Sequence, residues 1–383
     1  MKATVSNTIA YALQDLGVET ITHVPGFGGS EVFESYKHIN LKNPPISFHE
    51  EVAYTICHGS SIVGKRSACL IKAQGIAKAA NSVVDSLYTS VNAGFVTFIF
   101  DDNVGNHSDN IMETEALLKG LSLPYIISDS ITIYDDVVSA FHKSETIKLP
   151  VAIIVNAAEI LNEVEFERQS YRKNFAYNRD ILQHVVHPLF AQYQYDVFKS
   201  KKDGNSNPEI ERPKLIHVPD DIPAQSKAAV KRYQQFFNVF QNFKGEIVTG
   251  DTSSSSSYAL PPYEAIDIVT YIGGSIPLAI GAYLAGNKDV WALSGDFGFI
   301  AAGHLGLLEA SLRKIPLKIV IFNNKQAAAT GGQQIHRTTL YKILAGYETH
   351  IRNISNPEDP FEITEILDEA SKADELRIII VNY

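Results

Sequence analysis

Cysteine is scarce in this sequence. Only Cys57 and Cys69 occur among 383 residues, each among small or apolar neighbours. Two cysteines cannot form a disulfide framework of several bridges, and their spacing matches no zinc or iron–sulfur motif. We therefore expect two buried free thiols in a reducing compartment and a cytoplasmic protein.

Positive charge and long apolar runs are also lacking. Lys and Arg number 33 against 43 Asp and Glu, for a net charge of -10, which argues against a nucleic-acid partner because phosphates require clustered cations. No run of about 18 apolar residues occurs, so no membrane span is predicted. The first residues show Ile9, Leu13 and Leu16 at helical spacing, which predicts an amphipathic helix capped by Ser6 rather than a signal peptide.

What is present is an alternation of short apolar runs with helical patterns. Most runs are continuously apolar, which is typical of strands buried on both faces of a parallel sheet. We therefore predict an α/β protein with two three-layer parallel-sheet domains, 1–160 and 246–383, joined by a polar connector at 161–245. The predicted strands are 19–24, 46–48, 67–72, 95–100 and 151–155, then 246–251, 290–296, 317–324 and 377–383.

A carboxylate and an amide end two runs that are predicted to be neighbouring strands. One run stops at Gly295-Asp296 and the next at Asn323-Asn324, with a helical pattern between them. Such crossovers are almost always right-handed and join parallel strands, so both ends lie at one edge of the sheet. Asp296 and Asn324 then either end two strands as ordinary turn formers, or supply hard oxygen ligands for Mg²⁺ or Ca²⁺.

This arrangement resembles the cofactor signature of thiamine diphosphate (ThDP)-dependent enzymes: Gly-Asp, about 26 residues, then Asn-Asn. The resemblance implies that Asp296, Asn324 and the backbone carbonyl of Gln326 hold Mg²⁺ against the diphosphate, with Gly295 beside the cofactor. The residue after the aspartate is usually glycine in the family, whereas here it is Phe297. We expect Phe297 to adopt a negative φ and to turn its ring away from the diphosphate.

A second resemblance lies in the segment HEEVAYTICHGSSIVGKRS, residues 49–67. In the family a glutamate at this place acts on the aminopyrimidine ring of the cofactor, and the pattern selects Glu50. Acidic residues in a first helical turn are also favoured by the helix dipole alone, which is the structural alternative. Neighbouring helical residues point about 100° apart, so Glu51 would be a surface residue.

Two further segments resemble the family on the diphosphate side. YIGGSIPLAIGAYLAG, residues 271–286, matches the helix start at which Ile272 would support the bent cofactor and Gly273, Gly274 and Ser275 would lie against it. The alternative is a helix start among core residues. The run of serines at 253–257 follows a predicted strand, so it is either low complexity or a loop in which Ser253 and Ser254 bind the cofactor.

Within this superfamily the sequence resembles the large subunit of indolepyruvate:ferredoxin oxidoreductase and, in layout, the phosphonopyruvate and sulfopyruvate decarboxylases. The matching blocks cover most of residues 5–160 and 245–340. The resemblance implies a pyrimidine-binding first domain and a diphosphate-binding second domain. It also implies a homodimer or a dimer of dimers, because the two halves meet across a subunit interface in the family.

Departures from the oxidoreductase pattern decide the expected function. The two cysteines cannot ligate an iron–sulfur cluster, Ser254 stands where the family has a cysteine, and the chain ends at Tyr383 soon after the second domain. We therefore expect a non-oxidative 2-oxo acid decarboxylase or carboligase, a lyase or transferase that works through a carbanion/enamine, with an aldehyde or ketone as the acceptor of a ligation. The alternatives are an oxidoreductase subunit with a separate electron carrier, and a cofactor-binding scaffold without catalysis.

Proton transfer and substrate binding need further side chains. His107 follows the predicted strand 95–100 in a loop that faces the cofactor in the family, and it is the candidate proton-transfer group. His49, His304 and Gln333 are the candidate substrate-binding residues. For each of them, a solvated or structural polar residue is the alternative.

Overall fold

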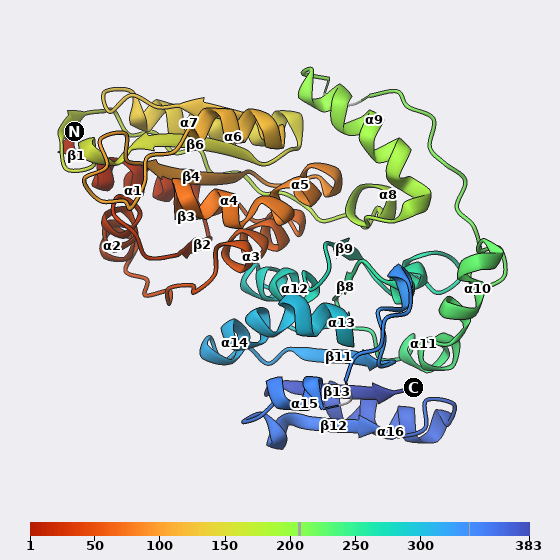
Figure 1. The fold of residues 1–383 in the computed structure, drawn as a ribbon. Coiled ribbons are helices and arrows are strands. Elements are labelled where there is room, and N and C mark those ends of the chain that lie inside the picture. Colours follow the sequence, from red (N-terminus) through yellow and green to blue (C-terminus); the bar gives the residue numbers. More distant parts are fainter. Residues whose placement is uncertain (206–207, 337) are drawn as a thin grey trace. The chain divides into compact units, whose positions relative to one another are not determined.

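The computed structural model describes residues 1–205, 208–336 and 338–383. It divides the chain into two compact units, Met1–Asn178 with Asp196–Glu209, and Arg179–Tyr195 with Ile210–Tyr383. The segment 161–245, predicted to be a connector, is therefore not a unit of its own but contributes to both. Figure 1 shows the elements of each unit.

The first unit contains a parallel sheet with the strand order β2-β3-β4-β6-β5. The strands are β2 Thr20–His23, β3 Ser67–Lys72, β4 Phe95–Asp101, β5 Tyr125–Ile127 and β6 Val151–Asn156. A separate antiparallel pair joins β1 Lys2–Thr4 to β7 Glu163–Glu165. The strand predicted at 46–48 is absent: Ser47 donates its N–H to the carbonyl of His23, 2.8 Å away, in an extended segment that leads into α3.

Helices cover both faces of this sheet (Figure 1). One side carries α1 Val5–Leu16 and α7 Ile133–Ile147, and the other carries α3 Glu50–Ile62, α4 Ala73–Lys78 and α5 Ala80–Thr89. The unit also contains α2 Gly29–Asn40, α6 Thr114–Leu121 and the short helix η1 Ala157–Glu159.

The predicted amphipathic N-terminal helix is α1, but its cap is Thr4 and not Ser6. The Thr4 hydroxyl accepts a hydrogen bond from the N–H of Asn7 at 3.3 Å, while Ser6 already has helical geometry and is buried. The observed cap differs from the predicted one because strand β1 is followed directly by the helix. The chain therefore leaves the extended conformation two residues earlier than the apolar spacing suggested.

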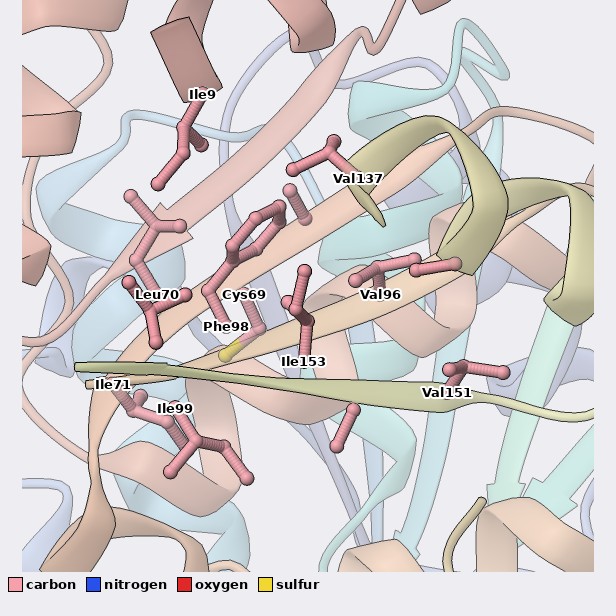
Figure 2. Packing of buried hydrophobic residues seen from close by; sticks show 14 of the residues in the cluster. Ile9, Cys69, Leu70, Ile71, Val96, Phe98, Ile99, Val137, Val151 and Ile153 are labelled. Atoms are coloured by element: carbon pink, nitrogen blue, oxygen red, sulfur yellow. The ribbon is translucent and has the colours of Figure 1, made fainter. Parts of the chain in front are cut away.

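The core of the first unit forms by alternation along the central strands (Figure 2). Leu70 and Phe98 point toward Ile9 of α1 and Val137 of α7, whereas Ile71 and Ile99 point to the opposite face. All six of these side chains are fully buried, as are both cysteine thiols. A strand that is apolar on both faces is what a sheet covered by two helical layers requires.

The second unit is built on a sheet of the order β12-β13-β11-β10-β8-β9, in which all neighbours are parallel. Its strands are β8 Ile247–Asp251, β9 Ile268–Thr270, β10 Val290–Gly295, β11 Lys318–Asn323, β12 Ile351–Ile354 and β13 Arg377–Asn382. The parallel pairing of β10 with β11 places Gly295 opposite Phe322, which confirms the crossover predicted from the sequence.

Helices again lie on both faces of this sheet. On one face are α12 Ser275–Leu284 and α14 His304–Leu312, and on the other are α11 Gln234–Phe240 and α16 Pro360–Ser371. Phe236, Phe240 and Trp291 pack together in the second core. The remaining helices of this unit are α8 Ile181–His184, η2 Pro188–Phe190, α10 Ala224–Lys231, η3 Ser254–Ala259, α13 Asp296–Gly298, η4 Phe299–Gly303, η5 Ala328–Thr330, α15 Thr339–Ile343 and η6 Glu348–His350. Helix α9 Ala191–Lys202 is divided between the two units.

Among the described residues, no helix has both the length and the apolar character that a membrane crossing requires.

The buried side chains of the central strands in the first unit lead to a prediction about stability. Phe98→Ala removes a fully buried ring from β4, and we expect it to lower the free energy of unfolding by about 3–5 kcal/mol. Urea unfolding followed by circular dichroism measures this change. The control is Phe361→Ala at an 84% exposed position, where a change of about 0.5 kcal/mol or less is expected. Equal effects of the two variants would contradict the assigned core.

Candidate functional site

A cavity lies where the second sheet reverses its strand order. From β8 the chain continues to β9 on one side, whereas from β10 it continues to β11 on the other, so the loops after β8 and β10 diverge at the carboxyl edge of the sheet. Ligands of open α/β sheets bind in such crevices. The cavity measures about 100 Å³, and its lining includes Ser253, Ser254, Ile272, Gly295, Asp296, Phe297, Asn324 and Gln326, all of them predicted site residues.

Asp296 is the buried carboxylate of this cavity. It begins α13 directly after β10 and is 1% exposed. Its Oδ1 accepts the N–H of Phe297 at 2.8 Å, and its Oδ2 accepts the N–H of Lys325 at 2.6 Å. Burial raises the pKa of Asp296, and these backbone hydrogen bonds oppose the rise. The bond to Lys325 ties the end of β10 to the loop after β11.

Asn324 is oriented by hydrogen bonds on both sides of its amide. Its Nδ2 donates to the hydroxyl of Tyr233 at 2.8 Å, and its Oδ1 accepts the N–H of Gln326 at 3.0 Å. Lys325, which stands between Asn324 and Gln326 in the chain, adopts the left-handed conformation with φ 60°, which is uncommon for a residue other than glycine. The carbonyl of Gln326 accepts one N–H, from Ala328 at 2.9 Å, and a carbonyl has a second lone pair to offer.

The backbone beside Asp296 borders open space. A Cβ added at Gly295 would meet no atom within 4 Å, so glycine there leaves room for a ligand to approach the main chain. Phe297, as expected, does not have a positive φ. Phe297 is 42% exposed and is one of the residues that line the cavity.

Asp251 also lines the cavity, and it was not predicted from the sequence. It ends β8, is 2% exposed, accepts the N–H of Ser275 at 2.8 Å and accepts a very short hydrogen bond from the Ser294 hydroxyl. Burial raises its pKa to about 6 although both hydrogen bonds oppose this. A signal was available: Gly250-Asp251 ends its strand in the same way as Gly295-Asp296.

Five further predicted residues lie outside the cavity lining. Gly273, Gly274 and Ser275 form the start of α12 behind it, where a Cβ on Gly273, with φ 88°, would lie 2.7 Å from the Ala302 side chain. His304 begins α14, with its Nδ1 3.3 Å from the carbonyl of Phe299. Gln333 is exposed, and its backbone carbonyl accepts the N–H of Ala327.

In the first unit, Glu50 lies at the carboxyl end of the sheet. It is the first residue of α3, with half-buried His49 as the N-cap. Its Oε2 lies 2.9 Å from the Nζ of Lys78, and a Cβ added at Gly75 would lie 2.9 Å from its Cγ. Glycine at 75 therefore allows Glu50 to pack against the start of α4.

Glu51 diverges from Glu50, as predicted, but it is not a surface residue. It is half-buried, and its Oε1 accepts a hydrogen bond from Asn81 Nδ2 at 3.2 Å. Burial raises the pKa of Glu51. Burial, followed by the negative charge of Glu51, raises the pKa of nearby Asp85 in α5 to about 6. The expectation failed because α5 packs over this turn of α3, which helical spacing alone does not show.

His107 lies in the loop after β4, as expected, and its side chain is exposed. Its ring stacks on Phe27 of the loop after β2, with 3.7 Å between ring centroids. The backbone N–H of His107 donates to Asp102 Oδ2 at 2.6 Å, and its backbone carbonyl accepts a hydrogen bond from the Nζ of Lys72 at the end of β3. Loops from three strands thus meet at His107 on one edge of the first sheet.

The second unit matches a known family. Residues 250–380 match the model described as thiamine pyrophosphate enzyme, C-terminal TPP binding domain, and this range contains the loops after β8, β10 and β11. This part of the second unit is therefore similar to a TPP-binding domain, and the predicted resemblance of the chain to thiamine diphosphate-dependent 2-oxo acid enzymes is confirmed.

Individual relatives agree with this assignment. The chain is similar to indolepyruvate oxidoreductase subunit IorA of Archaeoglobus fulgidus (25% identical over 156 residues, 39% of this chain and 25% of the relative). It is also similar to IorA of Methanothermobacter marburgensis (27% identical over 162 residues, 42% and 24%). The chain spans about a quarter of the length of these curated relatives.

A solved structure shares the fold over the whole chain. The thiamine diphosphate-dependent 4-hydroxybenzoylformate decarboxylase of Rhodococcus jostii RHA1 superposes with a TM-score of 0.67, at 15% identity, over 99% of both chains. The predicted α/β architecture with two parallel sheets is thereby confirmed.

The half-buried acid pair of Glu51 and Asp85 generates a prediction about pH. The carboxyl of Asp85 ionises near 3.8 in an unfolded chain and at about 6 in the fold. Between these values the folded protein binds more protons than the unfolded chain, so this group lowers the free energy of unfolding as the pH rises. We expect Asp85→Asn to remove this loss, so that the variant gains up to about 3 kcal/mol over the wild type near pH 7 and little near pH 4.

Urea unfolding across this pH range measures the difference, and Asp135→Asn, at an exposed position in α7, is the control. A pH dependence that is identical in Asp85→Asn and in the wild type would contradict the assignment.

Proposed function

We propose that the protein is a ThDP- and Mg²⁺-dependent, non-oxidative 2-oxo acid decarboxylase or carboligase. One observation carries the proposal: the cavity at the strand reversal gathers Asp296, Asn324 and the loop serines within the segment that matches a TPP-binding domain. When bound, ThDP supplies an electron sink for cleavage of the bond to the carboxylate.

The charge of the cavity supports a divalent cation. Asp251 and Asp296 both line it, and none of its described lining residues is Lys or Arg. A diphosphate placed beside two carboxylates would be repelled, so a bound cation must supply the missing positive charge. Asp296, the amide oxygen of Asn324 and the carbonyl of Gln326 are the hard ligands that Mg²⁺ accepts together with phosphate oxygens.

A site of this composition differs from a cluster of ionisable ligands. In the described part of the chain, no three or more His, Cys, Asp or Glu side chains are grouped so that they could hold a metal. One carboxylate, one amide and one main-chain carbonyl are sufficient when the diphosphate itself contributes oxygens.

The other residues of the cavity would position the cofactor. Ser253 and Ser254 offer hydroxyl donors to diphosphate oxygens, Gly295 allows a close approach to the backbone, and Ile272 supplies an apolar contact. We propose that Glu50 holds the proton exchanged with the aminopyrimidine ring, and that His107 is a proton donor or acceptor for substrate. His49, His304 and Gln333 remain proposed substrate contacts.

The proposed small-molecule partners are a 2-oxo acid and, for a ligation, an aldehyde or ketone. The proposed assembly is a homodimer or a dimer of dimers.

The IorA relatives favour one alternative, a 2-oxo acid oxidoreductase subunit. The 383 residues contain two cysteines, both buried, whereas a cluster needs four ligands, so this alternative requires an electron carrier outside these residues.

The metal proposal is tested by cofactor binding. We expect Asp296→Ala and Asn324→Leu to weaken ThDP binding in the presence of Mg²⁺ at least ~tenfold, because each removes a ligand oxygen. Isothermal titration calorimetry with ThDP, with and without EDTA, measures this. Asn353→Ala, at an exposed position on β12, is the control and should bind as the wild type does. ThDP binding that is insensitive to EDTA would contradict the Mg²⁺ site.

The activity is tested by incubating purified protein with ThDP, Mg²⁺ and a panel of 2-oxo acids and measuring CO₂. We expect release without any added electron acceptor. Glu50→Gln should slow it at least ~100-fold, because the variant keeps the shape of the side chain but cannot exchange a proton. Glu51→Gln is the matched control beside it and should retain most of the activity. An absolute requirement for ferredoxin or a viologen dye would favour the oxidoreductase alternative.

A further inference from the structure

Tyr233 lines the cavity of the candidate site, but the cofactor assignment gives it no role. It stands between α10 and α11, in the segment predicted to be a connector. It is 4% exposed, and its ring packs against Phe322 and Tyr383, with ring centroids 5.0 Å and 5.1 Å apart. Its backbone N–H donates to the carbonyl of Val230 at 3.1 Å. The side chain is therefore held in place at the wall of the cavity.

The hydrogen bond between Tyr233 and Asn324 can run in only one direction. The backbone N–H of Gln326 lies 3.0 Å from one end of the Asn324 amide and needs an acceptor there, so that end is the oxygen Oδ1. The nitrogen Nδ2 then faces the Tyr233 hydroxyl oxygen at 2.8 Å. Because an amide NH₂ group donates and does not accept, the Tyr233 oxygen is the acceptor of this bond.

The O–H of Tyr233 is therefore left to donate to another group. Among the residues that the structure describes, Asn324 is the one hydrogen-bond partner of this hydroxyl. A tyrosine ionises at a pH of about 10, so the hydrogen is present near neutral pH. A buried donor without an acceptor is unfavourable, so this side chain favours a ligand that brings an acceptor oxygen into the cavity.

Hydrogen-bond donors are scarce in this cavity, where we place the diphosphate. None of the described residues that line it is Lys or Arg. The Thr252 hydroxyl donates to the carbonyl of Thr270 at 2.5 Å. The hydroxyls of Ser253 and Ser255 bond to each other at 2.8 Å, which uses one of their two donors. The uncommitted O–H of Tyr233 is thus one of the few donors available to an anion here.

We propose that Tyr233 is a cofactor-binding residue whose hydroxyl donates a hydrogen bond to a diphosphate oxygen of ThDP while it accepts one from Asn324. This inference rests on the proposed function. One hydroxyl then connects the anionic end of the cofactor to a proposed Mg²⁺ ligand, so that the diphosphate and the metal are bound together. Tyr233 lies outside residues 250–380, which match the TPP-binding domain, so the segment before that domain contributes to the site.

The test measures the binding of ThDP and of inorganic pyrophosphate, each with Mg²⁺, by isothermal titration calorimetry. Tyr233→Phe keeps the ring and removes the hydroxyl. We expect it to weaken both ligands at least ~tenfold, because both offer phosphate oxygens and the lost hydrogen bond is to a charged group. Tyr383→Phe is the matched control. It removes a neighbouring buried hydroxyl that has no hydrogen-bond partner among the described residues, and it should change either affinity less than ~twofold.

A double variant separates a direct contact from an effect that acts through Asn324. In Asn324→Leu the amide is absent, so a tyrosine that only orients Asn324 has no further effect on binding. A hydroxyl that donates to the diphosphate is still lost in the double variant. We therefore expect Tyr233→Phe to weaken pyrophosphate binding by at least a further ~fivefold in the Asn324→Leu background.

Phosphorus NMR of bound ThDP is the second readout. At saturating ThDP and Mg²⁺, Tyr233→Phe should shift a diphosphate resonance relative to the wild type, whereas Tyr383→Phe should not. Wild-type affinity for pyrophosphate in Tyr233→Phe, or an effect that disappears in the Asn324→Leu background, would overturn the proposal. Wild-type protein that binds neither ThDP nor pyrophosphate would instead contradict the proposed function.

Discussion

The cavity of the second unit depends on the buried carboxylate of Asp251. It bonds the first N–H of α12 through Ser275 and the end of β10 through Ser294, while its own backbone ends β8. The serine loop, the Ile272 turn and the Asp296 turn are therefore held in one arrangement by one side chain. The cost of burying that carboxylate is reflected in its raised pKa, and the hydrogen bonds that it accepts recover part of that cost.

Parallel pairing explains why the sequence predicts that Asp296 and Asn324 lie at one edge of the sheet, where both line the same cavity. A helix separates Asp296 from Asn324 in the chain. Because the right-handed crossover makes β10 and β11 parallel, both strands nevertheless end at the same edge of the sheet. The apolar runs were long enough to identify the central strands. The short edge strands β5, β9 and β12 were missed because three or four residues carry too little pattern, and their pairing depends on neighbours distant in the chain.

Other features depend on contacts that a linear pattern does not contain. Glu51 was expected at the surface and is half-buried because α5 covers it, and the cap of α1 moved to Thr4 because strand β1 precedes it directly. Asp251 escaped prediction although it repeats the Gly-Asp strand end of Asp296, because its task is to tie elements together and no motif marks that task. Segment 161–245 reads as one polar connector, but its hydrophobic residues are divided between two cores.

The left-handed backbone at Lys325 has a consequence for how this sequence can vary over evolution. The residue stands between Asn324 and Gln326, which are joined by the hydrogen bond from the Gln326 N–H to the Asn324 Oδ1, and its own N–H bonds the Asp296 carboxylate. Glycine, asparagine and aspartate tolerate such a φ, whereas valine, isoleucine and threonine are strongly disfavoured by their branched side chains. Among descendants of this chain, position 325 should therefore drift toward small or polar residues and exclude β-branched ones, even though its side chain is not among the assigned ligands.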